Sequence, residues 1–175
     1  MYRVPDQDQA LTGNCMHDRP VILSEYEVNS PDEMANFGKR LARIVGIGDV
    51  LFLIGDLGTG KTTLAQGLIG ELAIETSEIT SPTYNLVHVY TAEKFEIWHA
   101  DLYRLKGPEQ VIQLGLEDAF SHALTLVEWP DRMGEMAPKN RLDIVIKKTE
   151  NGRNIALRAA DSGDPEGWKG RLNGL

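Results

Sequence analysis

Apolar residues in the centre of the chain follow strand and helix spacing. Residues 50–54 read Val-Leu-Phe-Leu-Ile, and such an unbroken run is typical of a strand buried on both faces of a parallel sheet. Residues 124–128 are largely apolar and predict a second strand of this kind. Residues 31–44 instead carry apolar side chains at helical spacing, which predicts an amphipathic helix (Met34, Phe37, Leu41, Ile44).

Local signals place the ends of this first helix. Ser30 is a good N-cap, Pro31 suits the first helical position, and Glu33 can complete a capping box. Gly46 and Gly48 are expected to end the helix. A second helix is predicted over residues 61–73, where leucines lie on one side (Leu64, Leu68, Leu72).

The remaining patterns complete an α/β fold. A helix is expected over residues 108–122, with a break near Gly115. Strands are expected at 21–28, at 84–91 and 94–102 as a hairpin joined near 92–93, and at 142–147 and 154–159 as a hairpin around Asn151-Gly152. We therefore predict a central mixed sheet flanked by helices, with a C-terminal antiparallel hairpin.

Composition divides the 175 residues into one domain and two flanking segments. Residues 1–20 are polar and are expected to form a flexible N-terminal extension. Residues 21–160 form the predicted domain, whose size suits a single core. Residues 161–175 contain four glycines and one proline and are expected to be a polar tail, in which Trp168 and Leu172 could dock on the domain.

Charge and cysteine usage narrow the function classes. The net charge is −8, which disfavours a protein that grips nucleic acid alone, because backbone binding rests on clustered Lys and Arg. The single cysteine, Cys15, excludes an internal disulfide. No apolar run approaches the ~20 residues of a membrane span, and residues 1–20 lack a signal-peptide core, so we expect no membrane contact and a cytoplasmic protein.

The strand at 50–54 leads directly into a phosphate-binding motif. Gly55-Asp56-Leu57-Gly58-Thr59-Gly60-Lys61-Thr62 matches the P-loop pattern in full, between a buried strand and an amphipathic helix. Glycines let backbone N–H groups turn toward phosphates, and the positive end of the following helix favours an anion. Lys61 would reach the β- and γ-phosphates, and the hydroxyl of Thr62 would bind magnesium. The motif predicts a P-loop NTPase fold with ATP and Mg²⁺ as ligands.

A P-loop enzyme needs a further acid near the metal, and two candidates follow predicted strands. Asp101 lies late in one strand, and Glu128 ends a buried strand, where ligands of such sheets bind. The loop Ser81-Pro82-Thr83 could close over the γ-phosphate, although its composition is also that of a common turn. His99 is more often structural than catalytic in such a position, and Trp129 could border the nucleotide or belong to the core.

Together these motifs resemble the TsaE (YjeE) family of bacterial P-loop ATPases. The resemblance covers about residues 21–160. Four segments carry it, namely Gly-Asp-Leu-Gly-Thr-Gly-Lys-Thr-Thr at 55–63, Ser-Pro-Thr-Tyr at 81–84, His-Ala-Asp-Leu-Tyr-Arg-Leu at 99–105 and Leu-Val-Glu-Trp-Pro at 126–130. Thr59 stands where the family often has alanine, and we expect little effect from it.

The resemblance implies a function and a set of site residues. It implies ATP hydrolysis that supports threonylcarbamoylation of the adenosine next to the anticodon in tRNAs reading codons that begin with adenine, together with TsaB-like and TsaD-like partners. tRNA would be reached through that complex. The implied magnesium ligands are Thr62, Glu128 and Asp101, of which Asp101 resembles the Walker-B acid. The expected catalytic residues are Lys61, Asp101, Glu128 and Thr83, and the expected nucleotide-binding residues are Asp56, Leu57, Gly58, Thr59, Gly60, Lys61, Thr62, Thr63, Ser81, Trp129 and Arg153.

Three other function classes remain to be weighed. A GTPase is disfavoured because Asn140-Arg141-Leu142-Asp143, which superficially resembles a guanine-reading motif, opens a predicted strand instead of following one. A small-molecule kinase would need an arginine-bearing lid, and residues 104–125 contain no Arg-rich loop. An adaptor that binds ATP without useful turnover stays open.

Overall fold

The computed structural model describes residues 20–75, 79–160 and 163–175. The expectations for residues 1–19, Cys15 included, lie outside the described residues. Among the described helices, none is both long enough and apolar enough to cross a membrane.

A seven-stranded mixed sheet forms the centre of the molecule, in the order β1-β7-β6-β2-β5-β4-β3. Four neighbouring strands, β6, β2, β5 and β4, run parallel, while β1, β7 and β3 pair antiparallel at the two sides. The strands are β1 (Pro20–Val28), β2 (Val50–Ile54), β3 (Val87–Thr91), β4 (Glu96–Asp101), β5 (Ala123–Glu128), β6 (Leu142–Lys148) and β7 (Arg153–Ala160). The predicted mixed sheet and its C-terminal hairpin, β6–β7, are confirmed.

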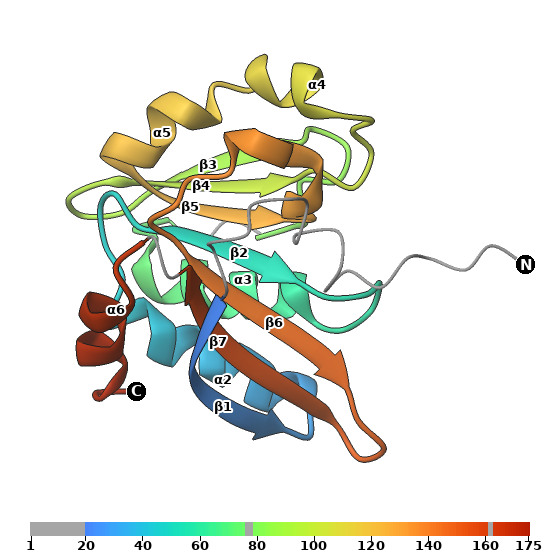
Figure 1. Ribbon diagram of the computed structural model, residues 1–175, viewed down its shortest axis with the longest axis vertical. Helices are drawn as coiled ribbons and strands as arrows, with labels where there is room; N and C mark the ends of the chain where they lie inside the picture. Colours follow the sequence, from blue (N-terminus) through green and yellow to red (C-terminus); the bar gives the residue numbers. More distant parts are fainter. Residues whose placement is uncertain (1–19, 76–78, 161–162) are drawn as a thin grey trace, which may run out of the picture.

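Helices cover both faces of the sheet, so the molecule has three layers (Figure 1). One face carries α2 (Pro31–Ala42), α3 (Lys61–Leu72) and α6 (Pro165–Leu172). The other face carries α4 (Pro108–Ile112), α5 (Leu116–His122) and the 3₁₀ segment η1 (Pro130–Met136). Each face therefore has its own apolar core, and β2 contributes alternate side chains to both.

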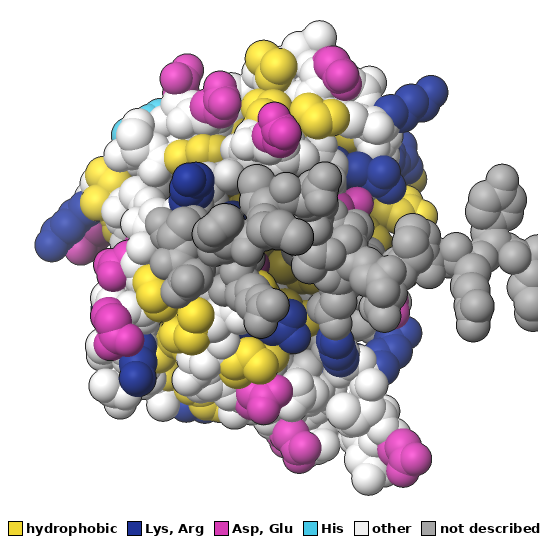
Figure 2. Space-filling model, viewed as in Figure 1, with side chains coloured by type: hydrophobic (Ala, Val, Ile, Leu, Met, Phe, Trp, Pro, Cys, Tyr) yellow, Lys and Arg dark blue, Asp and Glu magenta, His cyan; other side chains and the backbone are white. Residues whose placement is uncertain are grey.

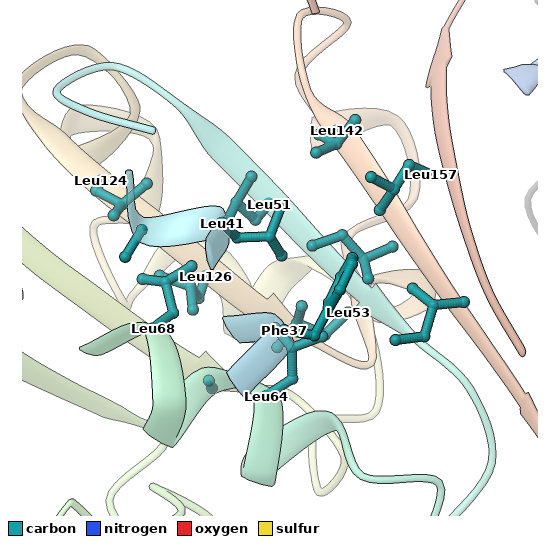
Figure 3. Packing of buried hydrophobic residues seen from close by; sticks show 14 of the residues in the cluster. Phe37, Leu41, Leu51, Leu53, Leu64, Leu68, Leu124, Leu126, Leu142 and Leu157 are labelled. Carbon is teal, nitrogen blue, oxygen red and sulfur yellow. The ribbon is translucent and has the colours of Figure 1, made fainter. Parts of the chain in front are cut away.

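The larger core lies between the sheet and the pair α2 and α3 (Figure 3). Leu51 and Leu53 of β2 face Phe37 of α2 and Leu64 of α3 in this core, and all four are at most 2% exposed. Gly38 lets α3 approach closely, because a Cβ there would collide with the carbonyl oxygen of Leu64. This packing fixes the start of α3, where the P-loop ends.

The start of α2 agrees with its sequence signals. The Ser30 hydroxyl accepts a hydrogen bond from the Glu33 N–H at 3.1 Å. The Glu33 carboxylate accepts from the Asn29 N–H at 2.7 Å, one residue before the cap. Both bonds satisfy donors at the helix N-terminus that would otherwise lack intrahelical partners.

Several element boundaries differ from the predicted ones. The strand expected from residue 84 begins at Val87, because residues 83–85 form a turn and Leu86 adopts a left-handed φ of 67°. The helical break at Gly115 is present, with φ of 70° at the N-cap of α5. The segment η1 was not predicted; it begins after Trp129, whose φ of 58° turns the chain away from β5.

The C-terminal segment requires a correction, because it contains a helix instead of a polar tail. Asp164 caps α6 by accepting from the Gly167 N–H at 2.9 Å. Trp168 and Leu172 are buried in the larger core, as the docking alternative expected. Arg171 makes two hydrogen bonds to the Asp49 carboxylate, at 2.7 and 3.0 Å. Two buried apolar side chains thus outweigh the weak helix propensity of a glycine-rich segment.

Candidate functional site

The P-loop lies at the edge of the sheet where the parallel strands end. β2 ends at Ile54 and α3 begins at Lys61, so the loop turns directly from the strand into the helix. Gly60 occupies the N-cap of α3 with φ of 107°, a left-handed conformation that favours glycine. With no side chain at the cap, the N–H groups of the first turn of α3 are available to an anion.

Lys61 is held inside the loop. The Lys61 side chain is almost fully buried. Its ammonium donates to the carbonyl oxygens of Gly55 at 2.6 Å and Asp56 at 2.9 Å. It also lies 4.1 Å from the ring centroid of Trp129, a cation–π distance. Burial lowers the pKa of Lys61, and the nearby carboxylates of Glu128 and Asp101 oppose that shift. The P-loop lysine and both predicted acids therefore share one site.

Thr62 and Glu128 are in direct contact. The Thr62 hydroxyl lies 3.0 Å from Oε1 and 3.1 Å from Oε2 of the Glu128 carboxylate. Glu128 is 2% exposed and ends β5, next to the end of β2. His99 Nε2 lies 2.9 Å from Oε1 of the same carboxylate. Two of the three magnesium ligands that the resemblance implies, Thr62 and Glu128, are thus adjacent.

Asp101 organises the loop at residues 81–83. Its Oδ2 accepts from the Thr83 hydroxyl at 2.7 Å and the Ser81 hydroxyl at 3.2 Å, and these two hydroxyls lie 2.7 Å apart. Its Oδ1 accepts from the Tyr103 N–H at 3.1 Å. Asp101 is paired in register with Glu128 on the neighbouring parallel strand. The hydroxyl-rich loop is therefore tied to the strand end that carries the second acid.

A pocket of about 290 Å³ opens on the other side of the P-loop. It is lined by the loop, the start of α2 and the β6–β7 turn, with Asn29, Met34, Thr63 and Arg153 among its residues. Arg153 donates through Nε to the Thr59 carbonyl at 3.2 Å and through a terminal nitrogen to the Gly58 carbonyl at 3.3 Å. The pocket combines apolar and polar groups, as small-molecule sites do.

The expected site residues fall into three groups. Lys61, Thr62, Glu128, Asp101, Ser81 and Thr83 are connected by the contacts above, whereas Gly58, Thr59, Gly60, Thr63 and Arg153 line the pocket. Asp56 contributes its carbonyl oxygen to Lys61. Leu57 points outward and is 72% exposed, and Trp129 contacts Lys61 without lining the pocket.

Sequence reasoning missed part of the site. Asn29, Ser30 and Met34 line the pocket, but the sequence indicated only an N-cap at Ser30 and an apolar helical position at Met34. Lys148, the last residue of β6, donates a hydrogen bond of 3.3 Å to the Leu57 carbonyl. The rejected guanine-reading motif does not reach the pocket lining, and its Asp143 is 2.8 Å from the Arg141 guanidinium.

The donor set suits a hard cation next to phosphates. Thr62 and Glu128 offer hydroxyl and carboxylate oxygens, the ligands that magnesium prefers. Within the described residues, no group of three or more His, Cys, Asp or Glu side chains could hold a metal alone. Magnesium usually takes one or two carboxylates and completes its shell with water and substrate phosphates.

The visible face of the molecule has no continuous basic surface among its described residues. Acidic and basic side chains are interspersed there (Figure 2).

Comparisons with known proteins agree on one family. The sequence profile described as "Threonylcarbamoyl adenosine biosynthesis protein TsaE" matches residues 28–155. The chain is 37% identical to the "tRNA threonylcarbamoyladenosine biosynthesis protein TsaE" of Rickettsia bellii over 135 residues, covering 77% of this chain and 94% of the relative. The protein of the same name from Bacillus subtilis is 36% identical over 137 residues, covering 77% and 85%. The crystal structure of Bacillus subtilis YdiB is similar with a TM-score of 0.68 at 27% identity, covering 91% of this chain and 98% of that one.

Proposed function

Because the chain belongs to the TsaE family of tRNA threonylcarbamoyladenosine biosynthesis, we propose that it is the subunit that binds and hydrolyses ATP with Mg²⁺ in that process. The observation that carries this proposal is the contact between the P-loop hydroxyl of Thr62 and the strand-end carboxylate of Glu128, at 3.0 Å. A hydroxyl and an acid in this relation are the two protein ligands expected of a P-loop magnesium site.

The phosphates of ATP would lie over the N-terminus of α3. Backbone N–H groups of the loop and the ammonium of Lys61 would neutralise them, and Thr62 and Glu128 would hold the cation. Bound Mg²⁺ supplies charge neutralisation at the β- and γ-phosphates. In hydrolysis, a water oxygen would bond to the γ-phosphorus as the bond from that phosphorus to the β–γ bridging oxygen breaks. The bridging oxygen would leave with ADP, and the water proton would pass to the released phosphate or to solvent.

The loop at Ser81 and Thr83 is suited to respond to the γ-phosphate. Both hydroxyls are donors that Asp101 holds at 3.2 and 2.7 Å. Each hydroxyl has one proton, so that proton would have to turn from Asp101 to the γ-phosphate before it could stabilise the negative charge that develops in phosphoryl transfer. We assign to Asp101 the role of holding this loop, and its direct ligation of the metal stays a prediction.

The nucleoside would occupy the pocket beside the loop. The pocket is continuous with Gly58, Thr59 and Gly60, and Met34 offers an adaptable apolar contact for a base. Arg153 would support the pocket by fixing the Gly58 and Thr59 carbonyls, because its guanidinium is already bonded to them.

The proposed reaction belongs to an assembly. We propose TsaB-like and TsaD-like partners and, as the final product, threonylcarbamoylation of the adenosine next to the anticodon in tRNAs that read codons beginning with adenine. The net charge of −8 favours tRNA contact through the partners and not through this chain alone. Tight, salt-sensitive binding of tRNA by the isolated chain would contradict that assignment.

Calorimetry with Mg²⁺ and either ATP or GTP tests which nucleotide the chain prefers. Phosphate release measured with and without the two partner subunits tests whether hydrolysis depends on the assembly. We expect tighter binding of ATP and a hydrolysis rate that rises when the partners are added. Preference for GTP, or transfer of the phosphoryl group to a small acceptor regardless of the partners, would support the GTPase or kinase alternatives. ATP binding without turnover in the full assembly would support an adaptor.

A further inference from the structure

His99 lies beneath the Thr62–Glu128 pair and is completely buried in β4. Its Nε2 is 2.9 Å from Oε1 of Glu128. Its Nδ1 is buried and has no hydrogen-bond partner within the described residues. A core residue that only filled space would not need to bury an unpartnered nitrogen, because burying a polar atom without a bond costs free energy.

The bond between His99 and Glu128 has a defined direction. An ionised carboxylate only accepts hydrogen bonds, so Nε2 must carry a proton. A lone pair is cheaper to leave unpaired than an N–H in a dry site, since buried acceptors are left under-satisfied more often than donors. The geometry therefore selects one tautomer, in which His99 is a donor to Glu128.

Only one of the two Glu128 oxygens receives this bond. The Thr62 hydroxyl is 3.0 Å from Oε1 and 3.1 Å from Oε2, so Thr62 does not distinguish them. His99 fixes Oε1, whereas Oε2 keeps only the Thr62 hydroxyl as a partner among the described residues, so Oε2 is the oxygen that a cation shared with Thr62 would meet. Without His99, the terminal torsion of a glutamate has a broad energy minimum and the carboxylate could rotate.

The sheet makes His99 a rigid support. His99 is paired with Leu126 and Asp101 with Glu128 on the parallel neighbour β5. Positions 99 and 101 alternate with Ala100 and share one face of β4. One strand thus carries both the group that fixes Glu128 and the acid that fixes the loop of Ser81 and Thr83.

We propose that His99 is a positioning residue, whose Nε2–H holds Oε1 of Glu128 so that the Thr62–Glu128 pair is preset for Mg²⁺. This inference rests on the proposed function, because it assigns a partner to a ligand of the proposed metal site. Groups that orient metal ligands in this way typically change metal affinity by about 10–100-fold when removed.

Three substitutions of His99 separate positioning from packing. H99Q can place an amide N–H near the position of Nε2, H99N places its amide near Nδ1, and H99L removes all polar atoms while keeping the site filled. Thr125→Val is the matched control, because the Thr125 hydroxyl is also buried and unpartnered on the adjacent strand but does not contact Glu128. Thermal unfolding identifies the variants that fold, and either H99N or H99L is sufficient as the variant without a donor at the position of Nε2.

The readout is the affinity of Mn²⁺, a spectroscopic substitute for Mg²⁺, measured by electron paramagnetic resonance in the presence of ADP. We expect H99N and H99L to weaken Mn²⁺ binding about 10–100-fold, H99Q to stay closer to the original chain, and T125V to change nothing. ADP affinity in EDTA should be the same in all of them. Unchanged Mn²⁺ affinity in H99L or H99N would overturn the inference while leaving the proposed function intact.

A second measurement needs no substitution. Nitrogen-15 NMR of the histidine rings in the full chain should show His99 protonated at Nε2 and not at Nδ1. The Nδ1–H tautomer would overturn the inference. If the original chain binds no Mn²⁺ with ADP, the proposed function fails, and the inference fails with it.

Discussion

At the scale of single residues, Lys61 binds the loop that it belongs to. Its ammonium is bonded to the carbonyl oxygens of Gly55 and Asp56 and faces the ring of Trp129. Phosphate oxygens would have to replace these contacts. The exchange is favourable only because a phosphate carries full negative charge, whereas the carbonyl groups carry dipoles.

Lys61→Met should therefore weaken ATP binding, while the methionine keeps the apolar part of the lysine side chain. A hydrogen bond to a charged group contributes about 1.5–3 kcal/mol, so we expect ATP affinity to fall at least about tenfold in calorimetry. Lys148→Met is the control, because Lys148 is exposed and contacts the same loop at the Leu57 carbonyl. Equal losses in the two variants would mean that general positive charge, and not the P-loop lysine, binds the nucleotide.

Asp131 gives a pH-dependent prediction. Burial raises the pKa of this carboxyl above its ordinary value of 3.8, and Arg132 and Lys61 only partly oppose the shift. The folded state therefore binds this proton more tightly than the unfolded state. The contribution of Asp131 to the free energy of unfolding falls as pH rises from 3.8 through the raised pKa of the folded state.

Asp131→Asn should accordingly stabilise the protein at pH 7, by up to about 1 kcal/mol for a partly exposed acid. The gain should vanish below pH 3.8, where the carboxyl is neutral in both states. Urea unfolding of both proteins across this pH range measures it. A stabilisation that persists at low pH would point to a packing effect of the amide instead.

Motif spacing predicted the residues of the candidate site, which the structure brings together at one edge of the sheet. Residues 55–63 are one continuous segment, the P-loop and the start of α3, and Asp101 and Glu128 lie at strand ends that parallel pairing brings to the same edge. The bond from His99 to Glu128 depends on which strands are neighbours, and Met34 reaches the pocket because α2 packs beside α3. Such contacts carry no local sequence signal.

At the scale of elements, two glycines allow α2 and α3 to pack closely against each other. A Cβ at Gly38 would collide with the Leu64 carbonyl, and a Cβ at Gly67 would collide with the Ala35 carbonyl. The backbone of each helix therefore lies directly against the backbone of the other at these two positions. Periodicity predicted both helices and their apolar sides, but a glycine within a helix predicts no particular neighbour.

Gly38→Ala and Gly67→Ala should each destabilise the fold by about 1–3 kcal/mol or more, because the added methyl group meets rigid backbone. Gly70→Ala in the same helix is the control. A Cβ there would lie 3.6 Å from the Ile79 Cδ1 atom, an ordinary contact, and the change removes the helix penalty of glycine, about 1 kcal/mol. The denaturant midpoint of unfolding should therefore fall for Gly38→Ala and Gly67→Ala and rise for Gly70→Ala. Similar losses of stability in Gly67→Ala and Gly70→Ala would contradict close packing of α2 and α3.

At the scale of the whole molecule, the two ends of β2 have different neighbours. The P-loop follows the end of β2, whereas Asp49, which is bonded to Arg171 of α6, precedes its start. The class of fold could be predicted, because buried runs and amphipathic helices alternate along the chain. The role of residues 163–175 could not, because a short glycine-rich helix becomes stable only when the core accepts its side chains.

Helix α6 should therefore stabilise the molecule without affecting nucleotide binding. Trp168 is 2% exposed in the larger core, and replacing a buried Trp by Ala typically costs about 3–5 kcal/mol. We expect Trp168→Ala to lower the unfolding midpoint strongly while ATP affinity, measured well below that midpoint, stays unchanged. Lys169→Met, at an exposed position of the same helix, should change neither. A loss of ATP affinity in folded Trp168→Ala protein would show that the two ends of β2 are coupled, so that the packing of α6 sets the shape of the P-loop.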